Sequence, residues 1–314
     1  MRPAKATALF MMVRRRSVFA VLAIVQLFFA TLAIAGKIAL RELSSPALVL
    51  ARVGGAALVF FAIHRLTTGE KIRERRDYLA LALYSVLGVS LNHLLYLAGL
   101  ERTTATTAQM FIVAGPAITL AVGMMRGAER GTLLKWTGIV LAGSGALTLV
   151  AAVPANNRLG NLFILTNVVI YSVYLVLTRG IVRRYHPLTV ITWIFAFGAM
   201  LLVPIGVAPL IRELPGLSLQ GWFAVVWIIA LPTVAAYYLN VWALLHVESS
   251  IVSAFVYLQP VLTAVMAVSI LGERPSARLL PSAALIAAGV AVTIHEQRAR
   301  ERGPSPADQS MVEV

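Results

Sequence analysis

The sequence predicts an all-α, polytopic membrane protein with ten transmembrane helices built as two inverted five-helix repeats. The first observation is composition: 59% of the 314 residues are hydrophobic, 13% are charged and the mean hydropathy is +0.84. A soluble domain carries about 25% charged residues. The second is length, because apolar stretches of roughly 18–25 residues recur along the chain, and each can cross a hydrocarbon core of about 30 Å. The third is an internal duplication, which divides the chain into two related halves.

Five apolar segments form the first expected repeat, which covers residues 17–153 and follows a cytoplasmic N-terminal tail at residues 1–16. Each segment ends at a short link marked by charge, glycine, proline or asparagine, such as Thr68–Lys71. The five expected helices are Ser17–Gly36, Pro46–Thr67, Tyr78–Leu100, Thr104–Met125 and Leu133–Val153.

The second expected repeat covers residues 159–295 and begins after the link Pro154–Arg158. Residues 296–314 are polar and contain Gly303-Pro304-Ser305-Pro306, so we expect a disordered cytoplasmic tail there. The five expected helices of this repeat are Leu159–Thr178, Pro187–Ile211, Leu219–Leu245, Ser249–Leu271 and Arg278–His295.

The dipeptides Glu129-Arg130 and Glu273-Arg274 stand 144 residues apart and mark the duplication. In both copies an apolar segment with a central proline precedes the charged pair, and a Gly-containing apolar segment follows it. A period of this length is half a protein, and membrane transporters are commonly built from two such halves. At the same offset, identical residues meet in the pairs Phe111 and Phe255, Pro116 and Pro260, Thr119 and Thr263, Leu141 and Leu285, and Gly145 and Gly289.

The positions of the 27 Lys and Arg residues predict the orientation. With the N-terminus in the cytoplasm, nineteen of them fall on the cytoplasmic side, seven fall on the outer side and Arg52 lies inside the second helix. This asymmetry follows the positive-inside rule. We therefore expect both termini in the cytoplasm and the protein in a cell membrane, either a plasma membrane or a bacterial inner membrane.

The N-terminal segment also allows an alternative interpretation as a cleaved signal peptide. Arg14-Arg15-Arg16 precedes the apolar run, and Ala33-Ile34-Ala35 resembles a small-residue cleavage site. Two observations favour a retained helix: the run is longer than the usual apolar region of a signal peptide, and its loss would break the five-plus-five repeat.

The odd number of helices in each repeat predicts inversion. A five-helix unit returns the chain on the opposite side, so the second half enters the membrane upside down. Inverted repeats of this kind place a substrate site near the midplane and allow alternating access when the halves exchange conformations. We interpret the two Glu-Arg pairs as structural groups that cap helix ends, rather than as substrate ligands.

These residues resemble a known family. A proline-centred apolar helix, then Leu271-Gly272-Glu273-Arg274, then a Gly-rich apolar helix is similar to the EamA repeat of the drug/metabolite transporter (DMT) superfamily. The first copy departs from the pattern in Gly127-Ala128-Glu129-Arg130 but keeps the charged pair, and Arg52 and the segment from Tyr96 through Ala108 also match. The resemblance covers about residues 18–295. It implies a ten-helix carrier of amino acids, other small metabolites or toxic compounds, frequently an exporter, without enzymatic chemistry of its own.

Composition excludes several other classes. The chain has no cysteine, so disulfides, Cys-ligated zinc, iron–sulfur clusters and thiol catalysis are excluded, and we expect no metal or cofactor. The net charge of +14 is explained by cytoplasmic loops near anionic membrane lipid rather than by nucleic acid, because no basic stretch is interleaved with stacking aromatics.

Two other functions compete with transport. A membrane-embedded enzyme that modifies lipids would need clustered aspartates or a motif such as His-Glu-x-x-His or Gly-x-Ser-x-Gly, and the sequence contains none of these. A structural membrane protein would not need inverted repeats or buried polar and aromatic groups.

All thirteen Asp and Glu residues fall in loops, at helix ends or in tails. Cation-coupled carriers usually keep a carboxylate within the membrane, so a facilitator or an exchanger is favoured. His93 keeps proton coupling open because its pKa near neutrality suits proton handling, although a neutral histidine bonded between helices is the favoured interpretation.

Arg52 lies about 9 Å inside the second helix, where it can bind a substrate carboxylate in a bidentate manner or snorkel towards the surface. We expect a central cavity between the third, fourth, eighth and ninth helices, since aromatic and amide groups suit a small amphipathic metabolite. The candidate substrate-binding residues are Arg52, His93, Tyr96, Gln109, Tyr237, Asn240, Tyr257 and Gln259.

The topology can be tested by cysteine labelling, because the chain has no cysteine of its own. A cysteine that replaces Ser310 should react with a membrane-impermeant reagent only after the membrane is opened, since ten spans return the C-terminus to the cytoplasm. Labelling of this cysteine in intact cells would contradict the predicted topology.

Overall fold

A computed structural model describes the protein over residues 3–127, 132–152, 157–244, 255–256, 258–274, 277 and 279–301. This part of the chain is helical and contains no strand, which confirms the all-α class. Within it, seven helices are long and apolar enough to cross a membrane. Three shorter apolar helices coincide with the fifth, ninth and tenth expected spans: Leu133–Thr148, Leu258–Leu271 and Leu279–Gly289. A multi-pass membrane protein is thus indicated, and the count of ten spans stays a prediction.

The N-terminal helix is longer than the sequence analysis expects. α1 begins at Pro3, fourteen residues before Ser17, so most of the expected N-terminal tail is helical. Its Ala, Met, Leu and Arg residues are strong helix formers, which explains the extension. The first half of the chain contains α1 (Pro3–Ala39), α2 (Ser45–Leu66), α3 (Arg75–Ser85), η1 (Val86–Ser90), α4 (Leu91–Arg102), α5 (Ala105–Ile112), α6 (Gly115–Met125) and α7 (Leu133–Ala152).

The second half resembles the first in its third span, which is divided by a π-helical segment. In the second half this segment holds Pro232. Residues 245–254 lie outside the described part. They contain the end of the expected eighth helix and the start of the expected ninth. The second half contains α8 (Arg158–Val182), α9 (Pro187–Glu213), the short 3-10 helix η3 (Leu214–Gly216), α10 (Leu219–Ile228), η4 (Ile229–Ala235), α11 (Ala236–Leu244), α13 (Leu258–Leu271) and α14 (Leu279–Glu301).

The two repeat-related prolines, Pro116 and Pro260, each lie in the first turn of a helix. The fourth expected helix is divided into α5 and α6 at Val113 and Ala114, and Pro116 occupies the first turn of α6. Pro260 occupies the first turn of α13. A proline at these positions removes no hydrogen bond that the helix would otherwise make, because the first N–H groups of a helix have no internal partner.

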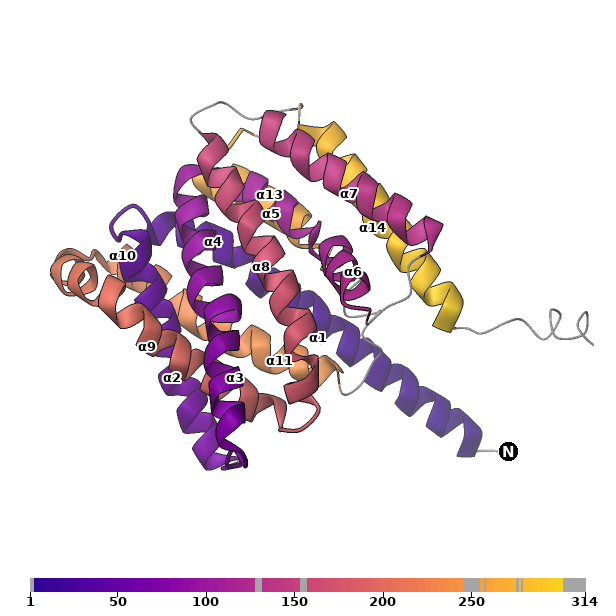
Figure 1. Ribbon diagram of the computed structural model, residues 1–314, viewed down its shortest axis with the longest axis horizontal. Coiled ribbons are helices and arrows are strands. Elements are labelled where there is room, and N and C mark those ends of the chain that lie inside the picture. Colours follow the sequence, from indigo (N-terminus) through magenta and orange to yellow (C-terminus); the bar gives the residue numbers. More distant parts are fainter. Residues whose placement is uncertain are drawn as a thin grey trace, which may run out of the picture.

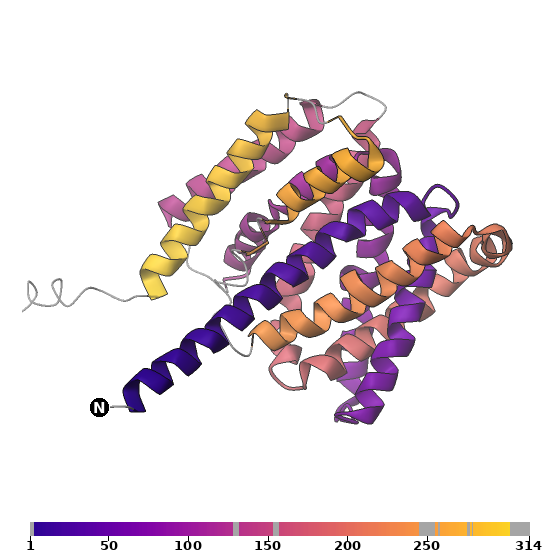
Figure 2. The same ribbon diagram turned by 180° about the vertical axis from the view of Figure 1, so that it is seen from behind.

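The helices pack in pairs that join distant parts of the sequence. α2 packs along α9, α4 along α8, α7 along α14, and α1 along α13. In Figure 1, α7 and α14 lie side by side at one edge of the molecule, and Figure 2 shows α1 running beside α13 from behind. The apolar core lies between the packed helices. It contains large, fully buried side chains such as Phe60 of α2, Phe111 of α5 and Phe195 of α9.

The pair of α7 and α14 depends on close backbone contact. A Cβ atom at Gly289 of α14 would lie 2.4 Å from the backbone nitrogen of Ala142 and 2.5 Å from the carbonyl oxygen of Gly138. Only glycine permits this approach, which follows the small-residue logic of membrane helix packing. Without aqueous solvent to drive association, such contact is a main source of helix affinity in lipid.

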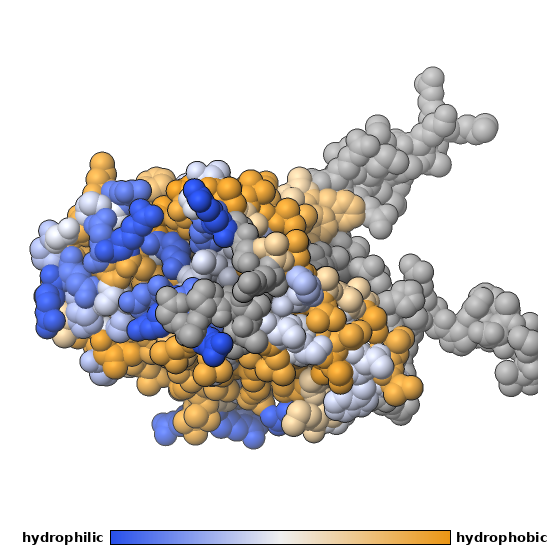
Figure 3. Space-filling view, turned by 90° about the horizontal axis from the view of Figure 1, so that it is seen from above, coloured by the Kyte–Doolittle hydropathy of each residue, from blue (hydrophilic) through white to orange (hydrophobic). Residues whose placement is uncertain are grey.

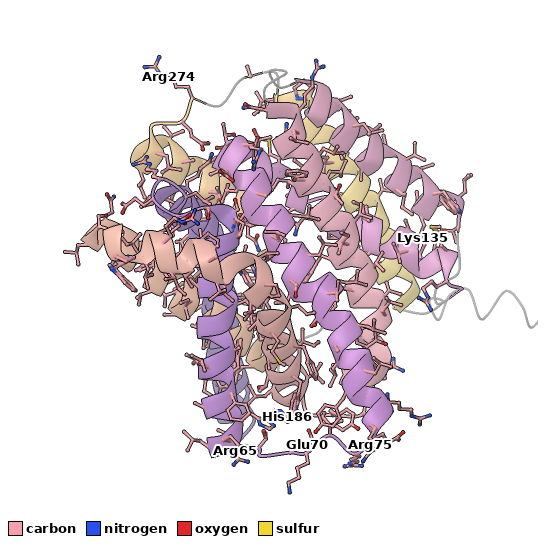
Figure 4. The ribbon with its side chains drawn as sticks, turned by 60° about the vertical axis from the view of Figure 1, so that its left-hand side comes forward. Arg65, Glu70, Arg75, Lys135, His186 and Arg274 are labelled. Carbon is pink, nitrogen blue, oxygen red and sulfur yellow. The ribbon has the colours of Figure 1, made fainter. Side chains whose placement is uncertain are left out.

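The surface is consistent with a membrane environment. Hydrophobic side chains cover much of the face shown in Figure 3, and hydrophilic ones gather in patches. Figure 4 places Arg65, Glu70, Arg75 and His186 at one end of the helices and Arg274 at the opposite end.

Loop carboxylates cap helices that come from the other half of the chain. Glu42 accepts hydrogen bonds from the backbone N–H and hydroxyl of Ser218, at 2.7 and 2.6 Å, at the start of α10. Glu213 does the same with Ser44, at 2.7 and 3.1 Å, at the start of α2. A carboxylate at a helix N-terminus satisfies free N–H groups and is stabilised by the helix dipole.

Two further carboxylates repeat this arrangement. Glu70 accepts hydrogen bonds from the N–H of His186 at 2.9 Å and the hydroxyl of Thr189 at 2.8 Å, at the start of α9. Glu273 accepts them from the N–H and hydroxyl of Thr106, at 3.2 and 2.8 Å, at the start of α5. We call Glu42, Glu70, Glu213 and Glu273 the cross-half carboxylates, because each one caps a helix of the opposite half. The capping interpretation thus describes the geometry of Glu273; Glu129-Arg130 lies outside the described residues.

The cross-half caps should depend on pH. The hydroxyl and backbone N–H of Ser218 hold the pKa of Glu42 below its usual value. Burial acts to raise the pKa of Glu70, but the hydrogen bonds from His186 and Thr189 outweigh it and lower this pKa as well. The stabilisation is therefore complete above the ordinary pKa of 4.5 and is lost as the pH falls through the lowered values.

We predict that the Glu42→Gln, Glu70→Gln double variant melts at a lower temperature than the wild type at neutral pH and loses less stability on acidification. Thermal unfolding of purified protein at pH 7 and at about pH 4 measures both effects. Glu74→Gln is the matched control, since Glu74 pairs with the exposed Arg76 and such surface pairs contribute little. Equal acid sensitivity of wild type and double variant would contradict the capping role.

Candidate functional site

Arg52 is a buried cation inside the helix bundle. Its side chain projects from α2 and is only 2% exposed. The Nε atom donates a hydrogen bond to Thr233 Oγ1 of η4 at 3.0 Å, whereas the terminal nitrogen Nη1 is buried and has no hydrogen-bond partner among the described residues. Among the described residues, no carboxylate forms an ion pair with Arg52. A charge in this position is costly unless a counter-charge or further hydrogen bonds satisfy it.

Three of the predicted residues surround this guanidinium. Tyr96 and His93 of α4 and Tyr237 of α11 lie near Arg52. His93 and Tyr96 are three residues apart and share one face of α4. Both are buried, and within the part of the chain that the structure describes the Nδ1 atom of His93 has no hydrogen-bond partner.

Phe195 of α9 joins these residues into one group. Its ring centroid lies 6.0 Å from that of His93, 5.8 Å from that of Tyr237 and 5.1 Å from that of Phe60. The contacts with Phe60 and Tyr237 are edge-to-face, an arrangement that aromatic quadrupoles favour. We call Arg52, His93, Tyr96, Phe195 and Tyr237 the arginine cluster. Both halves of the chain contribute to it.

Two tyrosines of α8 extend the aromatic surface. Tyr171 and Tyr174 stack with centroids 5.6 Å apart, and both lie near Tyr237. The Tyr174 ring occupies the space that a side chain at Gly88 would fill, because a Cβ atom there would lie 2.4 Å from the ring. Gly88 belongs to η1, so this segment makes room for the aromatic group.

Three glutamines form a second polar group. Gln259 of α13 donates to Gln26 Oε1 of α1 at 2.6 Å, and its own Oε1 accepts from Gln109 of α5 at 3.3 Å. All three are buried, and Gln109 Oε1 has no partner. Phe29, one turn after Gln26, packs its ring edge-to-face on Tyr237 at 6.0 Å, so the glutamine network adjoins the arginine cluster.

A reciprocal pair of asparagines holds α4 against α8. The side chain of Asn92 donates to the carbonyl oxygen of Asn167 at 3.3 Å, and that of Asn167 donates to the carbonyl oxygen of Asn92 at 2.8 Å. Asn92 directly precedes His93, so this clasp fixes the helix that presents His93 and Tyr96. Both asparagines are polar residues within apolar segments, and this is the feature by which the sequence could have indicated them.

The structure thus groups most, but not all, of the predicted residues. Arg52, His93, Tyr96 and Tyr237 come together in the arginine cluster, and Gln109 and Gln259 in the glutamine network. Asn240 lies one turn after Tyr237 and is partly buried, with no hydrogen bond from its side chain to the described residues. Tyr257 lies outside the described part of the chain.

Three residues that contact the predicted site residues were not among the candidates of the sequence analysis. Gln26 is a polar residue in an otherwise apolar segment, Thr233 follows a proline within a span, and Phe195 carries no polar signal at all. Over the described residues, no group of three or more His, Cys, Asp or Glu side chains could hold a metal ion.

Comparisons with known proteins agree on a family. The model of the EamA-like transporter family matches residues 16–151 and again residues 158–295. An uncharacterized transporter of Archaeoglobus fulgidus is 26% identical over 282 residues, which cover 88% of this chain and 96% of that protein. An uncharacterized transporter of Bacillus subtilis is 23% identical over 250 residues, or 77% of this chain and 78% of that protein.

A third relative has a more specific name. A probable terminal-alkyne amino-acid exporter of Streptantibioticus cattleyicolor is 26% identical over 250 residues, which cover 79% of this chain and 84% of that protein. One solved crystal structure shares the fold with a TM-score of 0.60 at 22% identity, over 88% of this chain and 97% of that chain.

The glutamine network and Asn240 should respond differently to the same substitution. Gln259→Leu leaves Gln26 and Gln109 without their amide partner, so we predict a loss of about 1–3 kcal/mol and a lower melting temperature. Asn240→Leu is the matched control and should melt near the wild-type temperature. Unchanged melting of Gln259→Leu would show that the network does not hold the helices together.

Proposed function

The chain belongs to the EamA-like transporter family, and we propose that it is a carrier or facilitator that moves small organic metabolites bearing a carboxylate, amino acids among them, out of the cell. The names of the family and of the relatives describe transporters, not enzymes. The amino-acid exporter of Streptantibioticus cattleyicolor supports both the substrate class and the outward direction.

The observation that carries this proposal is the unsatisfied Arg52. Its guanidinium is 2% exposed, its Nη1 atom has no partner, and its surroundings among the described residues supply hydroxyl, imidazole and aromatic groups but no carboxylate. A buried cation without a counter-charge is destabilising, because no partner compensates for the lost hydration, and an anion that binds beside it relieves this penalty. A substrate carboxylate supplies this anion, and a guanidinium is suited to bind it through two parallel hydrogen bonds.

The aromatic residues fit the remainder of such a substrate. Phe195 and Tyr237 offer apolar ring faces in the arginine cluster, and the stacked pair Tyr171 and Tyr174 extends this surface from the side of Tyr237. Ligand sites typically combine an apolar lining with a few fixed polar groups. Within this proposal His93 is a neutral group near the cation, and Gln109, Gln259, Asn240 and Tyr257 line the central cavity that the sequence analysis expects.

Alternating access between inverted repeats is the proposed mechanism. Three features support it: the cross-half carboxylates form similar caps in both directions, α2 packs on its counterpart α9, and π-helical segments occur at the third span of each half. The separation of Glu70 and His186 from Arg274 in Figure 4 fits the orientation with both termini in the cytoplasm. We propose that residues 17–153 and 159–295 are the two repeats and that ten helices span the cell membrane.

Transport in proteoliposomes tests the proposal. Radiolabelled L-amino acids are offered one at a time, without an imposed proton or sodium gradient, next to the carboxamide of each. We expect wild-type protein to transport at least one acid down its own gradient and to discriminate against the amide, which lacks the charge that Arg52 binds. Arg52→Gln should lower transport of the acid about tenfold or more and abolish the discrimination.

The control for this experiment is stability. Removing a buried, unpaired charge does not weaken packing, so Arg52→Gln should melt at or above the wild-type temperature. Arg52→Lys keeps the charge without the planar fork and should transport the acid at an intermediate rate. Wild-type transport of the acid by Arg52→Gln would refute the proposed role of the guanidinium.

A further inference from the structure

Thr233 follows Pro232 in the π-helical segment η4. The hydroxyl of Thr233 donates to the carbonyl oxygen of Ile228, the last residue of α10, at 2.8 Å.

This bond fixes the orientation of the Thr233 hydroxyl. A carbonyl oxygen only accepts hydrogen bonds and a guanidinium only donates them. The single hydroxyl proton must therefore point to Ile228, and its lone pairs must face the Nε atom of Arg52, which lies 3.0 Å away. Thr233 is fully buried, so water does not compete for either bond.

The direction of this bond determines which edge of Arg52 is free. The hydroxyl oxygen of Thr233 accepts the hydrogen bond of Nε, which is the single hydrogen bond that the guanidinium makes to the described residues. Nη1 stays unpaired in the interior, on the part of the fork that remains for a ligand. Thr233 lies in the second half of the chain and Arg52 in the first, so the contact also fixes the cation relative to the opposite half.

We propose that Thr233 is a positioning residue, which holds Arg52 through Nε so that its terminal nitrogens face the carboxylate of the substrate. This inference rests on the proposed function. It predicts that the hydroxyl matters for the binding of the substrate, through Arg52, more than for the later steps of transport.

Two substitutions separate the hydroxyl from the shape of the side chain. Thr233→Val keeps the shape and removes both hydrogen bonds, and Thr233→Ser keeps the hydroxyl. Thr192→Val is the matched control, because Thr192 is also buried and its hydroxyl bonds the carbonyl oxygens of Leu188, one turn earlier, at 2.7 Å and of Phe60 in the opposite half at 3.3 Å. In the described part of the chain Arg52 bonds Thr233 and not Thr192. If Thr233→Val does not fold, Thr233→Ala removes the same hydroxyl without adding an apolar methyl group.

The readout is the split between KM and maximal rate in proteoliposomes, with the radiolabelled L-amino acid that the wild type transports fastest and with its carboxamide. We expect Thr233→Val to raise KM for the acid about tenfold, as for the loss of a hydrogen bond to a charged group, with the maximal rate changed less than about twofold. KM for the amide should not change. Thr233→Ser and Thr192→Val should behave like the wild type, and Thr233→Val should add nothing to Arg52→Gln.

The outcomes separate the two proposals. If Arg52→Gln itself leaves transport of the acid unchanged, or if no acid is transported, the proposed function fails and the positioning role fails with it. If Arg52→Gln removes the preference for the acid but Thr233→Val keeps the wild-type KM, the positioning role alone is overturned. The positioning role is also overturned if Thr233→Ser is as impaired as Thr233→Val.

Discussion

Each helix that starts at the end of a membrane span leaves backbone N–H groups without an internal partner, and this chain supplies the missing acceptors from its opposite half. The cross-half carboxylates each cap a helix of the opposite half: Glu42, Glu70, Glu213 and Glu273. These acceptors satisfy the first N–H groups of α2, α5, α9 and α10, where an uncapped helix end is less stable. The caps join the two halves of the chain at both ends of the bundle (Figure 4), and α2 packs along α9 between them.

The functional site depends on the same principle, applied to side chains rather than to helix ends. Asn92 and Asn167 satisfy each other across α4 and α8, and the glutamine network joins α1, α5 and α13. Among the described residues, the free Nη1 atom of Arg52 is one of a few buried side-chain atoms without a hydrogen-bond partner, and it is the one that belongs to a charged group. A buried charge without a partner costs more than an unpaired neutral amide, which makes the guanidinium the strongest candidate to bind a ligand.

Much of this arrangement could be predicted from the sequence, because helical membrane segments are encoded in composition and length. The class and most helix positions follow from apolar runs, and the duplication follows from the repeated Glu-Arg dipeptide and its surroundings. Arg52, His93 and Tyr237 stand out as polar groups in apolar surroundings, and they do meet. Phe195 could not be predicted, since an apolar ring in an apolar span carries no signal, and its role depends on the tertiary packing of α9. The early start of α1 was missed because hydropathy marks the limits of a span, not of a helix.

The π-helical segments set the direction in which the site residues point. His93 and Tyr96 follow η1 within the same span, and Tyr237 and Asn240 follow η4. A π turn accommodates one residue more than an α turn, and one residue corresponds to about 100° around the helix axis. Conversion of either segment to regular α-helix would therefore swing the downstream side chains by more than a quarter turn and withdraw them from Arg52. Each π-helical segment thus sets the rotation of the helix that follows it, one in each half of the chain. The arginine cluster depends on both segments.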